Sequence, residues 1–318
     1  MEQTLLGFQT TLRQKIDFNG IGVHSGQPVS MTLLPADENT GIVFNVTCPK
    51  TGNIEDIPAT FTSISSTDLC TVLGQANGIY IATVEHLMAA LRALNVDNVI
   101  VEIDSNEVPV MDGSSRVFVD AVNQVGIRTL SALRCYIRVN RPVRVDMGAS
   151  WGEFIPHSGT RFEVEIDFDS EAIGNQKYAS DLTAATFSKD LSGARTFGFM
   201  KDVERLWAAG YALGSSLENS VVIGDDNRVI NPDGLRYKDE FVRHKTLDAI
   251  GDLALAGAPI LGCYRSYRGG HKLNALVLQA LLSDKSAFDF VEATSSQPRV
   301  SPNDMVAVGA PAYAAVLF

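Results

Sequence analysis

Apolar and polar residues alternate over much of the first 130 residues, as they do in strands with one buried face. Glycine and proline residues interrupt this alternation and mark turns between strands. Two stretches instead space their apolar residues three or four positions apart, which is typical of an amphipathic helix. The predicted strands are residues 11–26, 27–36, 57–74, 78–83 and 98–104, and the predicted helices are residues 84–95 and 114–126.

The same succession of strands and helices restarts after about residue 130. Residues 196–236 contain several glycines without a clear period and are predicted to be irregular. The predicted strands of this part are residues 135–147, 151–157, 160–169 and 258–268, and its predicted helices are residues 187–194, 238–256 and 271–284.

This order of elements predicts an α+β protein with two domains, residues 1–130 and residues 131–318. Each domain is expected to be an antiparallel-rich sheet packed with helices on one face, so that the two sheet layers enclose the helices. A cleft between two such layers is a common place for a binding site.

The composition changes this picture only by excluding some classes of function. The chain has 318 residues, of which 45% are apolar and 20% charged, which is ordinary for a globular protein. Its formal net charge of −11 argues against binding to nucleic acid, which needs a basic face. An anionic ligand would therefore have to be held by a local group of Lys and Arg residues.

Cysteine usage and hydropathy predict a cytoplasmic location. Cys48, Cys70, Cys135 and Cys263 are far apart, so neither a disulfide framework nor a cysteine zinc site is expected. The first residues lack the basic start and apolar core of a secretory signal. No apolar run approaches the roughly 18 residues that span a bilayer, so stable membrane insertion is not expected.

A line of polar residues crosses the predicted helix 238–256. An α-helix turns about 100° per residue, so His244, Asp248 and Asp252 lie within about 80° of one another. His244 and Asp248 point the same way one turn apart and are candidates to share a metal ion. Spacing of this kind is, by itself, more typical of a solvated polar face.

The other histidines strengthen the metal interpretation, since the chain has only five. A zinc hydrolase needs three protein ligands and a carboxylate base, and often a cationic acid. His86 is the candidate third ligand beside His244 and Asp248, and Glu85, which directly precedes it, is the candidate base.

His271 follows two glycines and is the candidate acid, kept protonated by Asp252. Structural alternatives remain open at this point. His271 is also an ordinary residue for the start of a helix, and Glu85 is a first-turn carboxylate favoured by the helix dipole.

Several motifs together resemble the UDP-3-O-acyl-N-acetylglucosamine deacetylases, the zinc enzymes of lipid A synthesis in Gram-negative bacteria. The resemblance extends from about residue 8 to about residue 285. The motifs are GIGVHSG (20–26), IATVEHLMAAL (81–91), PVMDGSS (109–115), ARTFGFM (194–200), DEFVRHKTLDAIGDL (239–253) and GGHKLN (269–274).

The resemblance implies hydrolysis of the N-acetyl group of UDP-3-O-(3-hydroxyacyl)-N-acetylglucosamine, which gives acetate and the free amine in the committed step of lipid A biosynthesis. It implies one Zn2+ per chain, although Fe2+ could occupy the same ligands. It also implies a monomer whose partner is a UDP-sugar with one fatty acyl chain, and no nucleic acid.

The family's residue roles then apply position by position. The resemblance implies that His86, His244 and Asp248 bind zinc, with Glu85 as base and His271 as acid beside Asp252. It implies that Thr196 contacts the oxyanion. The implied substrate contacts are Lys245 and Phe197 for the nucleotide-sugar, Asp167 and Phe168 for uridine, Leu69 and Cys70 in a loop that lines the site, and residues 198–222, with the bulky Trp207 and Tyr211, for the acyl chain.

Other functions remain possible from the residues alone. A zinc amidase that acts on another acylated sugar would need the same metal site, but it would not need an apolar channel for the acyl chain. Two histidines and one carboxylate also occur in non-haem iron oxygenases, although these usually use a β-barrel. A non-enzymatic binding domain would tolerate Glu85→Ala without loss of function.

Overall fold

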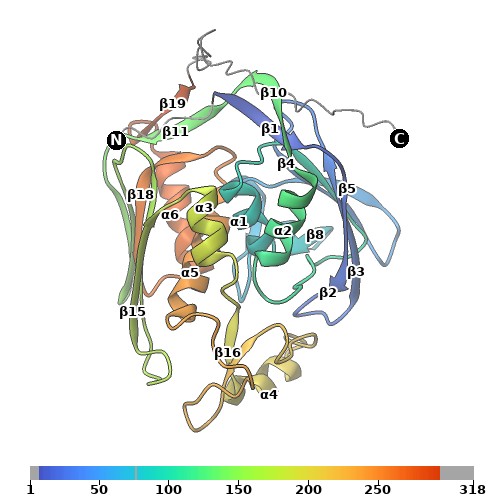
Figure 1. Cartoon of the computed structure of the whole chain (residues 1–318), viewed down its shortest axis with the longest axis vertical. Helices are drawn as coiled ribbons and strands as arrows, with labels where there is room; N and C mark the ends of the chain where they lie inside the picture. The colour runs from blue at the N-terminus through green and yellow to red at the C-terminus, as the bar shows by residue number, and fades with distance from the viewer. Residues whose placement is uncertain (1–6, 76, 294–318) are drawn as a thin grey trace, which may run out of the picture.

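The computed structural model describes residues 7–75 and 77–293. It confirms the predicted α+β class, with two antiparallel-rich sheets on the outside and helices between them (Figure 1). The helices are α1 (Glu85–Ala93), α2 (Arg116–Val125), α3 (Ala184–Thr186), α4 (Met200–Ala208), α5 (Glu240–Ala254) and α6 (His271–Ser283).

The first large sheet has five strands in the order β2-β3-β9-β4-β5. Neighbours are antiparallel except for β4 and β9, which are parallel. The alternating burial of β2 and β4 shows why the alternating sequence forms this sheet, since one face packs on the helices. The strands are β2 (Ile16–Ile21), β3 (Pro28–Pro35), β4 (Ile42–Thr47), β5 (Ile54–Pro58) and β9 (Val99–Ile103).

The second large sheet has seven strands. Its centre is β18 (Ile260–Tyr267), whose residues are nearly all buried. This strand pairs antiparallel with β13 and parallel with β11 and β14. The other strands are β11 (Cys135–Val139), β12 (Val143–Met147), β13 (Ser150–Ile155), β14 (Thr160–Asp167), β15 (Asn175–Asp181) and β19 (Phe288–Glu292).

The described residues also form three small sheets. One pairs β1 with β10, one contains β6, β7 and β8, and one pairs β16 with β17 in parallel. Two short non-α helices are η1 (Phe61–Ser63) and η2 (Phe187–Leu191). The strands are β1 (Phe8–Leu12), β6 (Ile64–Ser66), β7 (Val72–Gly74), β8 (Tyr80–Ala82), β10 (Ile127–Leu133), β16 (Phe197–Phe199) and β17 (Val221–Ile223).

Helix α5 lies at the centre of the molecule and is buried on almost every side (Figure 1). It packs against α1, which carries Glu85 and His86 at its start, and against α6, which begins at His271. A Cβ atom added at Gly251 of α5 would lie 1.9 Å from the carbonyl oxygen of Glu85. The missing side chain therefore allows α1 to approach α5 at the position of Glu85.

Several sequence expectations were wrong. The region 196–236, predicted to be irregular, contains β16, α4 and β17. Met200, Val203, Leu206 and Trp207 of α4 are spaced three or four residues apart, so the helical pattern was present in the sequence although the glycines of this region favoured an irregular segment. The predicted strand 11–26 is two strands followed by a turn, in which the N–H of Gly26 donates to the carbonyl of Gly22. The predicted strand 135–147 is likewise two strands, β11 and β12, and strands β4, β5, β10, β15 and β19 were not predicted.

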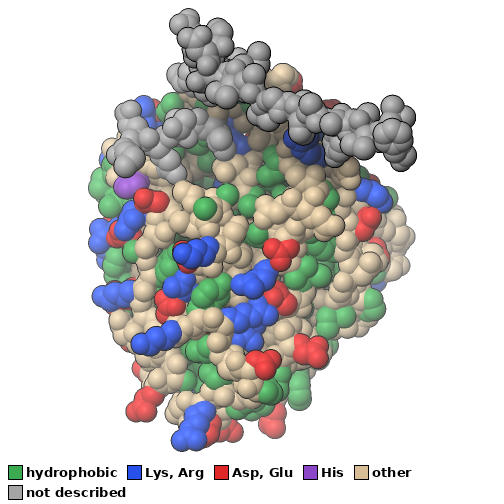
Figure 2. Space-filling view, viewed as in Figure 1, with side chains coloured by type: hydrophobic (Ala, Val, Ile, Leu, Met, Phe, Trp, Pro, Cys, Tyr) green, Lys and Arg blue, Asp and Glu red, His purple; other side chains and the backbone are tan. Residues whose placement is uncertain are grey.

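The division near residue 130 stays a prediction. Strand β10 crosses that position and pairs with β1, and one hydrophobic core includes side chains from before and after it, such as Leu87 and Leu247. Acidic and basic side chains are interspersed on the face that Figure 2 shows. Within the described ranges, no helix is both long and apolar enough to cross a bilayer.

Candidate active site

Three buried side chains converge between α1 and α5. His86 is the second residue of α1, and His244 and Asp248 lie one turn apart on α5. One donor atom from each lies within 4.8 Å of the other two. The Nε2 atoms of His86 and His244 are 3.6 and 3.3 Å from Oδ1 of Asp248. Because all three are at most 5% exposed, the alternative of a solvated polar face is excluded.

The donor set fits a divalent transition metal. The Nδ1 atom of His244 lies 3.1 Å from the carbonyl oxygen of Ala194, to which it can donate, and this leaves Nε2 free as a ligand. The Oδ1 atom of Asp248 is buried and forms no hydrogen bond among the described residues. Burial of an unpartnered carboxylate oxygen is costly, and a cation at this position would compensate it.

The ionisation of these groups suits the same use. Burial lowers the pKa of His244 to about 4, so its imidazole is neutral at pH 7. Burial alone would raise the pKa of Asp248, but the neighbouring His244 and Lys245 hold it well below its usual value. Lys245 donates from Nζ to Oδ2 of Asp248 over 2.7 Å, whereas the two histidines lie near the other carboxylate oxygen, Oδ1.

A second group of titratable side chains lies beside the first. Glu85, Asp252 and His271 also bring donor atoms within 4.8 Å of one another. The Nδ1 atom of His271 lies 2.9 Å from Oδ2 of Asp252, and its Nε2 atom lies 3.9 Å from Oε1 of Glu85. Burial alone would lower the pKa of His271, but Asp252 and Glu85 raise it to about 9. Its imidazole is therefore protonated at neutral pH.

Two residues that the sequence analysis missed hold this second group. The backbone N–H of Thr71 donates to Oε2 of Glu85 over 3.1 Å, and its hydroxyl donates to Oδ1 of Asp252 over 2.6 Å. Asn274 donates to Oδ2 of Asp252 over 2.8 Å. Asn274 follows His271 by three residues on α6, and this spacing on one helix face was the signal available in the sequence.

The turn before α1 is strained. Thr83 has φ of +59°, which is unusual for a β-branched residue. Its hydroxyl lies 3.1 Å from Oε1 of Glu107, a buried carboxylate that also accepts from the backbone N–H groups of His24 and Ser25. Glu107 thus connects the turn that precedes Glu85 with residues 20–26 through hydrogen bonds. Backbone strain of this kind is concentrated at functional sites.

A cavity of about 570 Å³ opens from these two groups. Thr196, Lys245, Phe197 and Phe168 line it, and the rings of Phe168 and Phe197 are 5.8 Å apart. Much of its remaining wall is apolar and comes from the segment that contains α4. The apolar residues of that segment in the wall are Phe199, Met200, Val203, Leu206, Trp207, Ala212, Leu217 and Val222.

The sequence-predicted substrate residues differ in where they lie. Leu69 is half exposed and lines the cavity, whereas Cys70 is buried outside the lining. Burial, with a contribution from Glu85, raises the pKa of the Cys70 thiol to about 12. Asp167 also lies outside the lining, and its carboxylate accepts hydrogen bonds from Tyr267 and Arg268.

The two bulky residues of the 198–222 segment face different surroundings. Trp207 lines the cavity, although 54% of its surface is exposed, and its Nε1 donates to the carbonyl of Ala212 over 3.1 Å. Tyr211 instead packs against the ring of His24, with the ring centroids 5.6 Å apart. Only Trp207 of this pair therefore forms part of the cavity wall.

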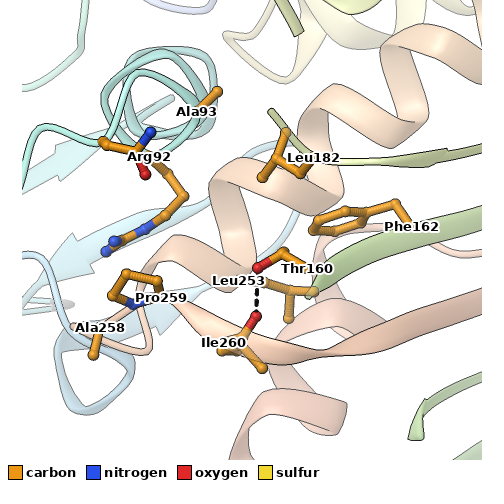
Figure 3. Close-up of a pocket in the computed structure, with 10 residues that line it drawn as sticks. Arg92, Ala93, Thr160, Phe162, Leu182, Leu253, Ala258, Pro259 and Ile260 are labelled. Atoms are coloured by element: carbon orange, nitrogen blue, oxygen red, sulfur yellow. Dashed lines mark hydrogen bonds between the residues drawn. The ribbon is translucent and has the colours of Figure 1, made fainter. Parts of the chain in front are cut away.

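A separate cavity of about 60 Å³ lies at the other end of α1 (Figure 3). The stem of Arg92 forms one side, and Leu182 and Phe162 lie across from it. The Thr160 hydroxyl donates to the carbonyl of Ile260 over 2.7 Å. None of the described residues lines both cavities, so this space belongs to the packing between layers.

Comparison with known proteins gives a consistent answer. The family described as UDP-3-O-acyl N-acetylglycosamine deacetylase matches residues 9–283. The chain is 58% identical over 289 residues to UDP-3-O-acyl-N-acetylglucosamine deacetylases of Brucella ovis and Brucella canis, covering 90% of this chain and 99% of each relative. The corresponding protein of Brucella melitensis biotype 2 is 57% identical over the same shares. These matches confirm the resemblance that the motifs indicated, and the chain belongs to the UDP-3-O-acyl-N-acetylglucosamine deacetylase family.

Proposed function

We propose that the protein hydrolyses the N-acetyl group of UDP-3-O-(3-hydroxyacyl)-N-acetylglucosamine and releases acetate and the free amine, the committed step of lipid A biosynthesis. The family membership supports the reaction and the substrate. The observation that carries the assignment to this site is the unpartnered Oδ1 of Asp248, which converges with two imidazoles beside the Glu85 and His271 pair.

The proposed metal is one Zn2+ per chain, held by His86, His244 and Asp248. Zinc commonly takes nitrogen and oxygen ligands of this kind, and Fe2+ accepts the same set. A zinc ion supplies Lewis acidity, which polarises a carbonyl and lowers the pKa of water from about 16 toward about 7. The neutral state of His244 and the ionised state of Asp248 support this role.

Glu85 is proposed as the general base. It follows the strained turn at Thr83, is only 3% exposed, and directs Oε1 toward His271 while Oε2 accepts from the Thr71 backbone. Burial chiefly raises the pKa of Glu85 above its ordinary value. A carboxylate with a raised pKa accepts a proton more readily from the water that attacks the acetyl carbonyl.

His271 is proposed as the general acid, with Asp252 as its positioning partner. The departing sugar amine must gain a proton, since an amide anion is a poor leaving group. The raised pKa of His271 keeps this proton available at neutral pH. Because Asp252 accepts from Nδ1–H, the Nε2–H of His271 is the group that points toward Glu85. Positioned acids and bases usually contribute about 10²–10⁴ in rate.

Thr196 is proposed to donate its hydroxyl to the oxyanion that forms when the carbonyl is attacked. It lines the cavity, and its backbone N–H donates to the carbonyl of Gly113 over 2.8 Å, which fixes its place beside the PVMDGSS motif. Loss of one donor of this kind typically costs about 3–4 kcal/mol of transition-state stabilisation.

The rest of the cavity is proposed to bind the substrate. Lys245 supplies positive charge toward the diphosphate, which the acidic protein as a whole does not. Phe197 and Phe168 offer aromatic surface to the nucleotide-sugar, and the apolar wall around Trp207 accepts the acyl chain. Each buried methylene of that chain contributes about 0.8 kcal/mol. The roles of Leu69, Cys70 and Asp167 in substrate binding stay predictions.

The hydrolase function accounts for the pair of Glu85 and His271 beside the metal group, since a non-haem iron oxygenase does not require such a pair. A monomeric state and a cytoplasmic location remain part of the proposal on sequence grounds. A single acyl chain gives only weak membrane attachment, so the substrate does not require stable docking on a bilayer.

The decisive experiment follows acetate release from UDP-sugars that carry 3-O-acyl chains of several lengths, with Zn2+-loaded protein. We expect release that depends on the acyl chain and is nearly abolished by Glu85→Ala, while the variant still binds metal. Absence of acetate with every substrate would reject the assignment. Full activity of metal-loaded Glu85→Ala would reject the proposed base.

A further inference from the structure

The polar line on α5 begins one turn earlier than the sequence analysis placed it. Glu240 lies four residues before His244 and continues the line through Asp248 to Asp252. It is fully buried, does not line the cavity and belongs to neither of the two groups described for the site. Its two carboxylate oxygens accept four hydrogen bonds, from Arg195 N (3.0 Å), Arg195 Nε (2.9 Å), Arg195 Nη2 (3.1 Å) and Arg236 N (2.6 Å).

The bond from the backbone of Arg195 connects Glu240 to His244. The N–H of Arg195 and the carbonyl of Ala194 belong to one peptide unit, and no peptide in the described ranges is cis. In a trans peptide the N–H and the C=O point in opposite directions. The N–H of this peptide donates to Glu240, and its carbonyl lies 3.1 Å from Nδ1 of His244. The carboxylate and the imidazole thus hold the same peptide from its two sides.

The surrounding contacts leave little freedom to this peptide. The N–H of Ala194 donates to the carbonyl of Leu191 over 2.9 Å, and the next residue, Thr196, is bonded through its N–H to Gly113. The guanidinium of Arg195 also donates to the carbonyl of Gly234 over 2.8 Å. Burial alone would raise the pKa of Glu240, but its bonds to Arg195 lower it, so the group is an anion.

We propose that Glu240 is a positioning residue, which fixes His244 through the Ala194–Arg195 peptide and orients its Nε2 toward the metal. This inference rests on the proposed metal site. An anion bound to the N–H polarises the peptide and makes its carbonyl a stronger acceptor for the imidazole N–H. Partners that hold a ligand histidine in this way typically change metal affinity or activity by about 10–100-fold when they are removed.

The first test is the Zn2+ dissociation constant of Glu240→Gln, measured by competition with a chelating dye. Glutamine keeps the shape but loses the charge and one acceptor. We expect Zn2+ binding to weaken by about 10–100-fold. The Co2+-loaded variant is expected to show an altered d–d absorption spectrum, because the orientation of His244 changes. Affinity and spectrum equal to those of the unaltered protein would overturn the proposal.

The matched control is a part-buried aspartate paired with a buried arginine, just past the end of α1 that lies opposite Glu85 and His86. Asp97 accepts from Arg134 Nε over 3.0 Å, and the arginine is only 1% exposed. Asp97→Asn is expected to lower thermal stability and leave the Zn2+ dissociation constant within about two-fold. An equal loss of Zn2+ affinity in Asp97→Asn and Glu240→Gln would mean that general destabilisation is responsible, and would overturn the proposal.

A second variant covers the case in which Glu240→Gln does not fold. Arg195→Lys keeps the backbone N–H that Glu240 holds and keeps a cation beside it, so Zn2+ affinity is expected to stay within about two-fold even if stability falls. A ten-fold loss in Arg195→Lys would contradict action through the peptide. Because Zn2+ binding is measured without substrate, these results stand apart from the acetate assay that tests the proposed function.

Discussion

The close crossing of α1 and α5 at Gly251 allows a sharp test of how packing sets the geometry of the site. Gly251→Ala would place a Cβ atom 1.9 Å from the carbonyl oxygen of Glu85. An ordinary contact is about 3.4 Å, so the two helices would have to separate by about 1.5 Å. This shift would move Glu85 and His86 on α1 away from His244 and Asp248 on α5.

The expected energies oppose each other and can be compared. Alanine in a helix interior is favoured over glycine by about 1 kcal/mol. Overpacking of a core typically costs about 1–3 kcal/mol, and here the overlap is with backbone, which cannot rotate away. We expect a net loss of about 2 kcal/mol in the free energy of unfolding. A misplacement of about 1 Å at a reacting centre can cost about 10²-fold in rate, so kcat should fall by about that factor.

The assay combines urea unfolding with steady-state rates of acetate release. Gly270→Ala is the control, since a Cβ atom added at Gly270 meets nothing within 4 Å and the backbone there is extended. The control should change stability by only a few tenths of a kcal/mol to about 1 kcal/mol and leave kcat near that of the unaltered protein. If Gly251→Ala is as stable and as active as the unaltered protein, the contact between α1 and α5 does not set the site geometry.

Three further predictions concern the same site. In metal-free protein, NMR titration of His271 should give a pKa of about 9, and Asp252→Asn should move this pKa toward 6.5. The raised pKa stabilises the fold below pH 6.5, and this contribution is lost as the pH rises through 9, so the variant should lose less stability over that range. An unchanged titration of His271 in Asp252→Asn would refute the pairing. Thr71→Val removes the hydrogen bond from the Thr71 hydroxyl to the Asp252 carboxylate, and a hydrogen bond to a charged group typically contributes about 1.5–3 kcal/mol. We expect kcat to fall by about ten-fold with little change in KM, and an unchanged kcat would exclude a positioning role for that hydroxyl. Chelation of the metal should lower the free energy of unfolding by about 4 kcal/mol relative to protein with free Zn2+ at 1,000 times its dissociation constant, and His86→Ala should show a much smaller chelator effect.

The layered fold explains why the polar line on α5 is a site and not a surface. A helix with polar residues on one line is usually solvated on that side. Here α1 and α6 cover the line, and the two sheets enclose all three helices (Figure 1). His244, Asp248 and Asp252 are each at most 3% exposed, so their charges must be satisfied by one another, by neighbours or by a bound cation.

Some partners in the site were beyond sequence reasoning because they are distant in the chain. Thr71 and Asp252 are separated by 181 residues, and Arg195 and Glu240 by 45. No local period connects such pairs. Asp167 and Phe168 show the opposite difficulty: they are adjacent in sequence, yet only Phe168 lines the cavity. Successive side chains at the end of a strand point in different directions, and the sequence does not tell which direction faces the ligand.

The sequence by itself determined the alternation that makes the strands, the spacing that places His244, Asp248 and Asp252 on one line, and the adjacency of Glu85 and His86. These are local properties, since side-chain direction repeats with the geometry of a helix or strand. Only the tertiary structure decided that α1, α5 and α6 pack together so that these side chains point toward one another in the interior. That outcome depends on the approach of α1 to α5 at Gly251 and on the two sheets that exclude water from the groups between them.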